Sequence, residues 1–126
     1  MVMKKFLCLG AFSCFLAVVA GALGSHGLKE MIMRLNGTTN FSTATDYMFY
    51  HGLALILVAL LADRYPHVVF QFVGWLFVAG SVLFQGNLFM ISLTGASSLS
   101  FLTPVGGICL MAAWLLLAVG TILIPK

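Results

Sequence analysis

Four apolar stretches, each long enough to cross a lipid bilayer, constrain this chain more than any other feature of its sequence. The hydrocarbon core of a bilayer is about 30 Å thick, so a spanning α-helix needs about 20 mostly apolar residues. The four stretches cover residues 6–24, 44–62, 68–93 and 104–124. They predict an all-α membrane protein in which residues 1–126 form a single integral membrane domain, a four-transmembrane-helix bundle.

The composition supports a bilayer rather than water as the solvent. Only 7% of the residues are charged and 62% are hydrophobic, whereas a soluble domain carries roughly 25% charged residues. The six Lys and Arg residues are scattered singly or in one pair, which argues against a nucleic-acid surface. The three cysteines lie inside apolar runs without CxxC spacing. We interpret them as packing residues, with a redox or metal role as the alternative.

The basic residues predict an orientation, because Lys and Arg in short flanks are held on the cytoplasmic side. With four spans both termini share one side of the membrane. That side carries Lys4, Lys5, Arg64 and Lys126, and the other side carries Lys29 and Arg34. We therefore expect both termini in the cytoplasm.

A cleaved signal peptide is an alternative for the first span, since Lys4, Lys5, an apolar run and the small residues 20–22 resemble one. Cleavage would leave three spans. We favour four, because the apolar run is of membrane length rather than the 7 to 15 residues of a typical signal peptide. A lipoprotein site at Cys14 fits less well, because the residues before it match such a signal poorly.

Several residues are typical of helix ends. The segment 43–46 matches a capping box, with Thr43 as the N-cap and Asp46 reaching back to it. Gly95 follows the third span as a C-cap would, and Thr103 with Pro104 predicts an N-cap and first helical residue for the fourth. A short turn is expected at residues 63–67.

Between the first two spans, helical spacing predicts a short interfacial amphipathic helix. Its apolar face consists of Leu28, Met31, Ile32 and Leu35, and its polar face of Lys29, Glu30 and Arg34. Glu30 and Arg34 are four residues apart, a spacing that favours an ion pair.

Polar residues collect on the side opposite the termini. The candidate cluster at this outer face consists of His26, Asp46, Tyr50, His51 and Thr103. One interpretation is an outward-opening pocket in which His26, Asp46 and His51 bind a metal, a haem or a proton. The other, which we favour, makes Asp46 a cap, His26 an interfacial residue and His51 a buried donor between two helices. Two histidines 25 residues apart lack metal-ligand spacing, so we predict no metal and no cofactor.

Within the spans, polar and small residues indicate helix contacts. Gln85 and Asn87 are polar residues of the third span, and such side chains in hydrocarbon normally turn toward neighbouring helices. Small residues allow helix backbones to approach closely. The glycines predicted to pack in this way are Gly21, Gly24, Gly86, Gly106 and Gly107.

Four blocks of the sequence resemble the domain-of-unknown-function 423 family. They are GALGSHGLKE, FSTATDYMFYHGLALI, FVAGSVLFQGNLFMISLTG and LTPVGGICLMAAWLLL, and together they extend over nearly the whole chain. The resemblance implies a small four-helix protein of a bacterial inner membrane, with transmembrane protein 256-like relatives in eukaryotes and no established activity. By similarity, the motif positions are Gly21, His26, Gly27, Thr43, Ala44, Tyr50, His51, Thr94, Gly95, Thr103, Pro104, Gly106, Gly107 and Trp114. Residues 85–87 depart from the serine-rich stretch usual in the family.

These observations favour a non-enzymatic helix-packing, accessory or interaction protein, since no catalytic constellation is present in the sequence. The alternative is an oligomeric transporter or channel for ions or small solutes, with His51 and Asp46 along its path. The expected partners are the lipid bilayer and either further copies of the chain or another membrane protein, and no nucleic acid.

Overall fold

The computed structural model describes residues 2–125 and confirms an all-α membrane fold. Its elements are α1 (Val2–Ser25), α2 (Lys29–Arg34), α3 (Thr38–Arg64), α4 (Val68–Ser81), the π-helix η1 (Val82–Gly86), α5 (Asn87–Thr94) and α6 (Leu102–Ile122). Within residues 2–125, four helices are long and apolar enough to cross a membrane: α1, α3, the continuous segment Val68–Thr94 formed by α4, η1 and α5, and α6.

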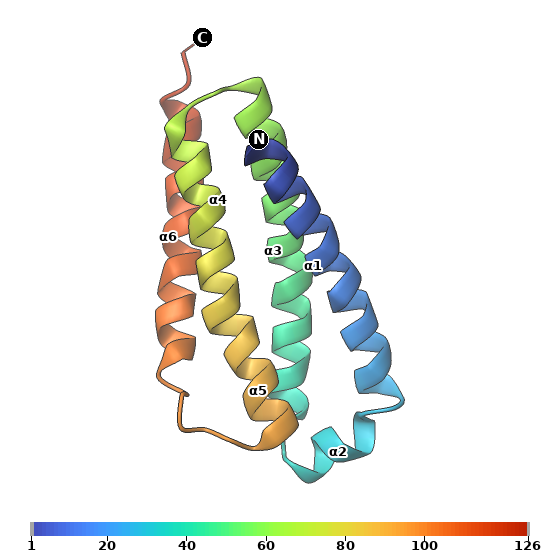
Figure 1. Cartoon of the computed structure of the whole chain (residues 1–126). Coiled ribbons are helices and arrows are strands. Elements are labelled where there is room, and N and C mark those ends of the chain that lie inside the picture. Colours follow the sequence, from blue (N-terminus) through green and yellow to red (C-terminus); the bar gives the residue numbers. More distant parts are fainter. Residues whose placement is uncertain (1, 126) are drawn as a thin grey trace.

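The four long helices lie side by side in the order in which they follow one another along the chain (Figure 1). α1 packs on α3, α3 packs on the α4–η1–α5 segment, and that segment packs on α6. Both ends of the chain lie at one end of the molecule together with the α3–α4 turn, here named the terminal end (Figure 1). α2 and the loop before α6 lie at the other, here named the α2 end. The α4–η1–α5 segment therefore has helices on two sides, whereas α1 and α6 are the outermost helices of the series.

The second span begins earlier than its apolar residues suggest. α3 starts at Thr38 and its N-cap is Gly37, which makes no side-chain cap. The capping box at residues 43–46 is therefore wrong, because Thr43 already lies inside the helix. The turn is made by Asn36, whose φ is 52°, and by Gly37, whose N–H donates to the carbonyl of Ile32 at 2.8 Å. This turn ends the short α2 and leaves the polar residues that follow free to form the first turns of α3.

The other helix ends match the sequence in part. Gly95 is the predicted C-cap of the third span: its φ is +71° and its N–H donates to Ile91 O, a conformation that favours glycine. α6 begins at Leu102, so Thr103 is not its N-cap, and Phe101 in that place makes no side-chain cap. Pro104 lies in the first turn, where its missing N–H costs no helical hydrogen bond.

α2 is the predicted short helix, and it crosses the α2 end from α1 to α3 (Figure 1). Ile32 is buried, while Arg34 donates to Glu30 at 2.7 Å with both side chains about four-fifths exposed, at 77% and 82%. Such an exposed pair contributes only about 0.3–0.5 kcal/mol. The burial of Ile32 therefore holds α2 in place more than the ion pair does.

The main apolar core lies toward the terminal end. Its largest fully buried apolar side chains are Phe6, Phe70, Phe77, Val58 and Val73. The Phe6 ring meets Trp75 edge-on at 5.3 Å and lies directly over Gly74, where a Cβ would collide with the ring. Phe6 therefore brings α1 into contact with α4 at this end, although α1 packs mainly on α3.

The α1–α3 contact depends on two glycines. A Cβ on Gly10 would stand 2.6 Å from the carbonyl oxygen of Gly52, and one on Gly52 would stand 2.6 Å from Cys14 Sγ. Ser13 Oγ also donates to Met48 O at 3.0 Å across the same interface. Small residues thus let the two backbones approach, as expected for helices packed in lipid.

Candidate functional site

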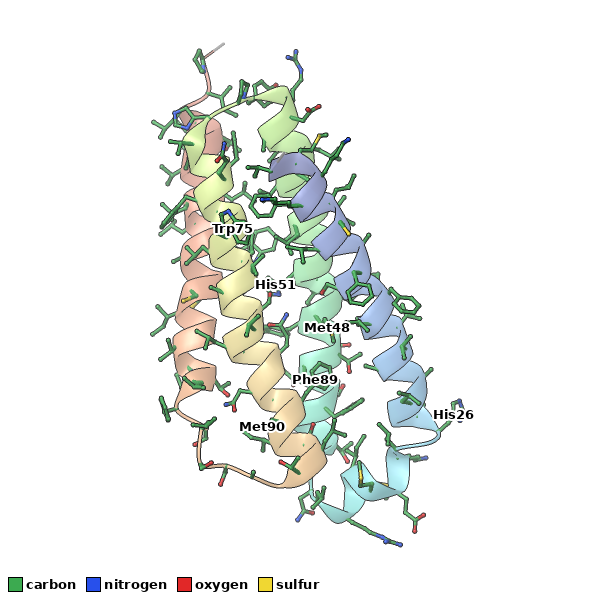
Figure 2. All side chains as sticks on the ribbon, viewed as in Figure 1. His26, Met48, His51, Trp75, Phe89 and Met90 are labelled. Atoms are coloured by element: carbon green, nitrogen blue, oxygen red, sulfur yellow. The ribbon has the colours of Figure 1, made fainter. Side chains whose placement is uncertain are left out.

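His51 of α3 lies midway along the molecule (Figure 2), is 4% exposed and has hydrogen bonds at both ring nitrogens. Its Nδ1 lies 2.8 Å from Tyr47 O, and Trp114 Nε1 donates to its Nε2 at 3.1 Å. Since a carbonyl only accepts, Nδ1 carries the ring proton, and Nε2 is the acceptor. The neutral ring therefore uses both nitrogens in structural hydrogen bonds, and it would have to lose its bond to Trp114 to take a proton or ligate a metal.

Aromatic rings fix the geometry of this hydrogen bond. Phe77 of α4 meets Trp114 edge-on, with ring centroids 5.0 Å apart and planes at 74°, and its ring centroid is 5.7 Å from that of His51. Edge-to-face pairs of this kind contribute about 0.5–1.5 kcal/mol beyond their buried area. The three side chains come from α3, α4 and α6, so they join three spans at one level.

An aromatic groove of about 510 Å³ opens beside this cluster, between α3 and α6. Its lining is almost wholly apolar or aromatic and consists of Tyr47, Tyr50, His51, Phe84, Gly107, Leu110, Met111 and Trp114. Its volume is in the range of sites that hold small apolar molecules or side chains, about 300–1,000 Å³. The arrangement can therefore accommodate an apolar group at the depth of the membrane spans.

A second polar contact ties α5 to the start of α6. Asn87, 5% exposed, donates from Nδ2 to Thr103 Oγ1 at 2.7 Å and to Leu99 O at 2.9 Å. The hydroxyl of Thr103 is thus engaged by Asn87 rather than by the backbone of its own helix. This contact accounts for two of the polar residues that the sequence singled out.

Gln85 occupies the π-helix η1 and is 3% exposed. Among residues 2–125 neither atom of its side-chain amide has a hydrogen-bond partner, and Ser81 Oγ and Asn87 Oδ1 share this condition. Buried polar atoms are normally paired, and π-helical turns are frequent at functional sites.

The five residues of the predicted outer-face cluster do not converge. His26 is exposed at the corner after α1, away from His51 (Figure 2). Asp46 lines a separate cavity between α1, α2 and α3, and Tyr50 lies on the wall of the aromatic groove with 54% of its surface exposed. Within residues 2–125 no three His, Cys, Asp or Glu side chains are placed to hold a metal ion. The cluster instead divides among four places: the corner with His26, the cavity with Asp46, the aromatic groove with Tyr50 and His51, and the contact of Thr103 with Asn87.

The predicted packing glycines differ in the space around them. A Cβ would collide with the Phe41 ring at Gly24 and would stand 2.5 Å from Phe84 N at Gly106. At Gly21 and Gly107 it would make ordinary contacts at 3.7 Å. Gly86 was expected to pack, but a Cβ there would meet nothing within 4 Å, because this position of η1 faces away from the neighbouring helices.

Two residues gained roles that the sequence did not reveal. Gly52 is the partner of Gly10, although only its place directly after His51 could have drawn attention to it. Lys29, expected on the polar face of the short helix, lines the same cavity as Asp46. The sequence pointed to Trp114 only through the family resemblance. The structure gives this residue a physical role, because its Nε1 donates a hydrogen bond to His51.

Comparison with known proteins extends these findings. A family profile described as "Protein of unknown function (DUF423)" matches residues 20–107. The UPF0382 membrane protein YwdK of Bacillus subtilis is 39% identical over 121 residues, which cover 95% of this chain and 98% of the relative. The UPF0382 membrane protein SSP2132 of Staphylococcus saprophyticus is 35% identical over 119 residues, 94% of this chain and 98% of the relative. No solved structure matches the chain.

The profile covers the end of α1, all of α2 to α5 and the start of α6, and thus includes His51, Gln85, Asn87 and Thr103. Trp114 lies beyond the profile but within the length shared with the full-length relatives. Together these matches show that the chain belongs to the DUF423 family of membrane proteins.

Proposed function

We propose that this protein is a non-enzymatic accessory protein of a bacterial inner membrane, which packs against a helix of another membrane protein. The observation that carries the proposal is the aromatic groove between α3 and α6. α1 and α6 end an open series of helices, and the groove offers a concave surface to a further helix. In lipid, such association depends on close packing and on interhelical hydrogen bonds.

The walls of the groove are held in position before a partner binds. The bond from Trp114 to His51 and the edge-on contact with Phe77 fix the Trp114 ring. Preorganised walls reduce the ordering cost of association. The same bond also favours the accessory function over the transporter alternative, because a proton path through His51 would have to break it.

The groove favours a different protein over a second copy as its occupant. Tyr47 and Tyr50 line the groove, and a tyrosine hydroxyl group can donate a hydrogen bond to a polar side chain of a partner. The large exposed side chains Ile108, Met111 and Leu115 of α6 carry no oxygen or nitrogen. A second copy that presented this face would therefore leave both tyrosines without an acceptor.

Site-specific photo-crosslinking in native membranes tests the proposal. A photoreactive residue at Met111, which is 65% exposed on the groove, should give one discrete product with another membrane protein. The Gly107→Leu change, which fills the groove floor without a clash at Cβ, should abolish that product. The control is the same photoreactive residue at Phe15, exposed on α1, which should crosslink only to lipid. A product of two copies, or none that depends on Gly107, would refute the proposal.

We also propose that both termini face the cytoplasm. Lys4, Lys5 and Arg64 flank the terminal end, and Lys29 and Arg34 flank the α2 end, so the excess of positive charge favours this orientation. Reporter fusions should be active as cytoplasmic fluorescent protein at the C-terminus and as secreted phosphatase within the loop at residues 96–100. The reverse pattern would overturn the orientation.

A further inference from the structure

A polar, open cavity of about 390 Å³ lies at the α2 end, bordered by the end of α1, by α2 and by the first turns of α3. Lys29 and Asp46 give it one charge of each sign, and Ser25, Thr38 and Ser42 give it hydroxyl groups. Its character is therefore opposite to that of the aromatic groove, and the function proposed for that groove does not involve it.

The two charges of the cavity are not paired with each other. Within residues 2–125 the structure has one ion pair, that between Arg34 and Glu30. Lys29 and Asp46 thus line the same cavity with opposite charges but do not form an ion pair with each other. A ligand that carries both signs could meet both charges at once, whereas a simple anion or cation would meet only one.

The place of Asp46 on α3 strengthens this argument. Asp46 comes eight residues after Thr38, which places it about 12 Å along the axis from the start of α3. Asp46 is an exposed residue that lines the cavity, and an ionisable residue within a membrane-length helix usually pairs with an opposite charge or marks a binding site. The cation that pairs with it would belong to the ligand.

An apolar groove lies beside this cavity. It measures about 280 Å³ between α1, α3 and α5, and all of its lining side chains are apolar. Phe41 lines both spaces, so one molecule with a polar head and an apolar chain could contact them together. This adjacency favours a lipid over a water-soluble ligand.

We propose that the cavity binds the phosphate–amine headgroup of a zwitterionic phospholipid such as phosphatidylethanolamine. Lys29 and the hydroxyl groups of Ser25 and Ser42 bind the phosphate, and Asp46 binds the primary ammonium group. Charge-assisted hydrogen bonds of this kind are about twice as strong as neutral ones. The acyl chains lie against the apolar surface of α1 and the groove beside Phe41.

Native mass spectrometry of the full chain, released from vesicles that contain equal amounts of phosphatidylethanolamine and phosphatidylglycerol, tests this site. We expect phosphatidylethanolamine adducts to dominate. Asp46→Asn and Lys29→Gln should each reduce them by about tenfold, as the loss of one charge-assisted contact predicts. Asp46→Glu should restore binding and thereby separates a loss of the charge from a loss of the fold.

Matched charge changes at the terminal end, Asp63→Asn and Lys5→Gln, should leave the adducts unchanged, since neither residue lines the cavity. Free phosphoethanolamine added in excess should not displace the lipid, because it lacks the apolar chains. Equal retention of both phospholipids, or equal effects of the cavity and control changes, would overturn the proposal. Displacement by free phosphoethanolamine would overturn the assignment to a lipid.

Discussion

Two adjacent glycines of α6 should respond in opposite ways to the same substitution. In Gly106→Ala, the new Cβ would stand 2.5 Å from Phe84 N and 2.9 Å from Leu83 C. The first distance is about 0.9 Å short of the 3.4 Å at which ordinary contact begins. Because both neighbours are backbone atoms of η1, no change of rotamer relieves the overlap, and α6 must move away from η1.

The cost can be placed between two limits. Overpacking a close contact costs about 1–3 kcal/mol. Alanine recovers at most about 1 kcal/mol through its higher helix propensity, and less in a bilayer, where an unfolded membrane protein keeps much of its helix. We expect the free energy of unfolding to fall by about 1–2 kcal/mol. In Gly107→Ala the Cβ makes only a 3.7 Å contact with the Phe84 ring, so the change should stay within about 0–1 kcal/mol and be stabilising.

The measurement is unfolding by sodium dodecyl sulfate in mixed lipid–detergent micelles, followed by tryptophan fluorescence. Trp114 reports the contact of α6 with α3 through its bond to His51, and both variants keep it. Equal midpoints for the two alanine variants would refute the assignment of Gly106 as the close contact between α6 and η1. A loss of stability in Gly107→Ala alone would show that Gly107, and not Gly106, makes the close contact.

Three further changes test the polar contacts under the same conditions. Trp114→Phe keeps an aromatic ring against Phe77 but removes the donor to His51, so the free energy of unfolding should fall by about 0.6–1.7 kcal/mol. A double-mutant cycle with His51→Leu should be non-additive, and strict additivity would contradict the hydrogen bond. Thr103→Val removes one of the two acceptors of Asn87 and should cost about 0.6 kcal/mol. Thr103→Ser, the control, should have no effect, and equal losses for the two variants would point to packing instead. Gln85→Leu replaces two unpaired buried atoms with apolar ones and should raise stability by about 1 kcal/mol, whereas a loss would show that the amide has a partner from outside the chain.

The two ends of the molecule differ in how their side chains pack. The apolar core and Phe6 hold the terminal end together, and the cavities at the α2 end lie where α1 meets α3 through Gly24 and Phe41. The chain thus uses close packing at one end and presents polar groups at the other. Membrane proteins commonly concentrate binding residues where polar side chains can be satisfied.

Sequence reasoning succeeded where the signal is local. Gly95 could be assigned as a C-cap because its residue type and its position after an apolar run suffice. The capping box at Thr43 failed because the pattern fits inside a helix as well as at its start, and the turn at Asn36 and Gly37 decided the boundary. Thr103 failed as an N-cap because its hydroxyl accepts from Asn87, sixteen residues away.

By itself, the sequence determined that the chain is helical, that it has four membrane-length segments and that a short amphipathic helix joins the first two. Only the tertiary structure decided which faces of those helices meet. The physical reason is that lipid tails are as apolar as a protein interior, so an apolar residue gives no sign of whether it faces lipid or another helix. Only the packing of the helices therefore reveals the hydrogen bond between Trp114 and His51 and the place of Lys29 and Asp46 in one cavity.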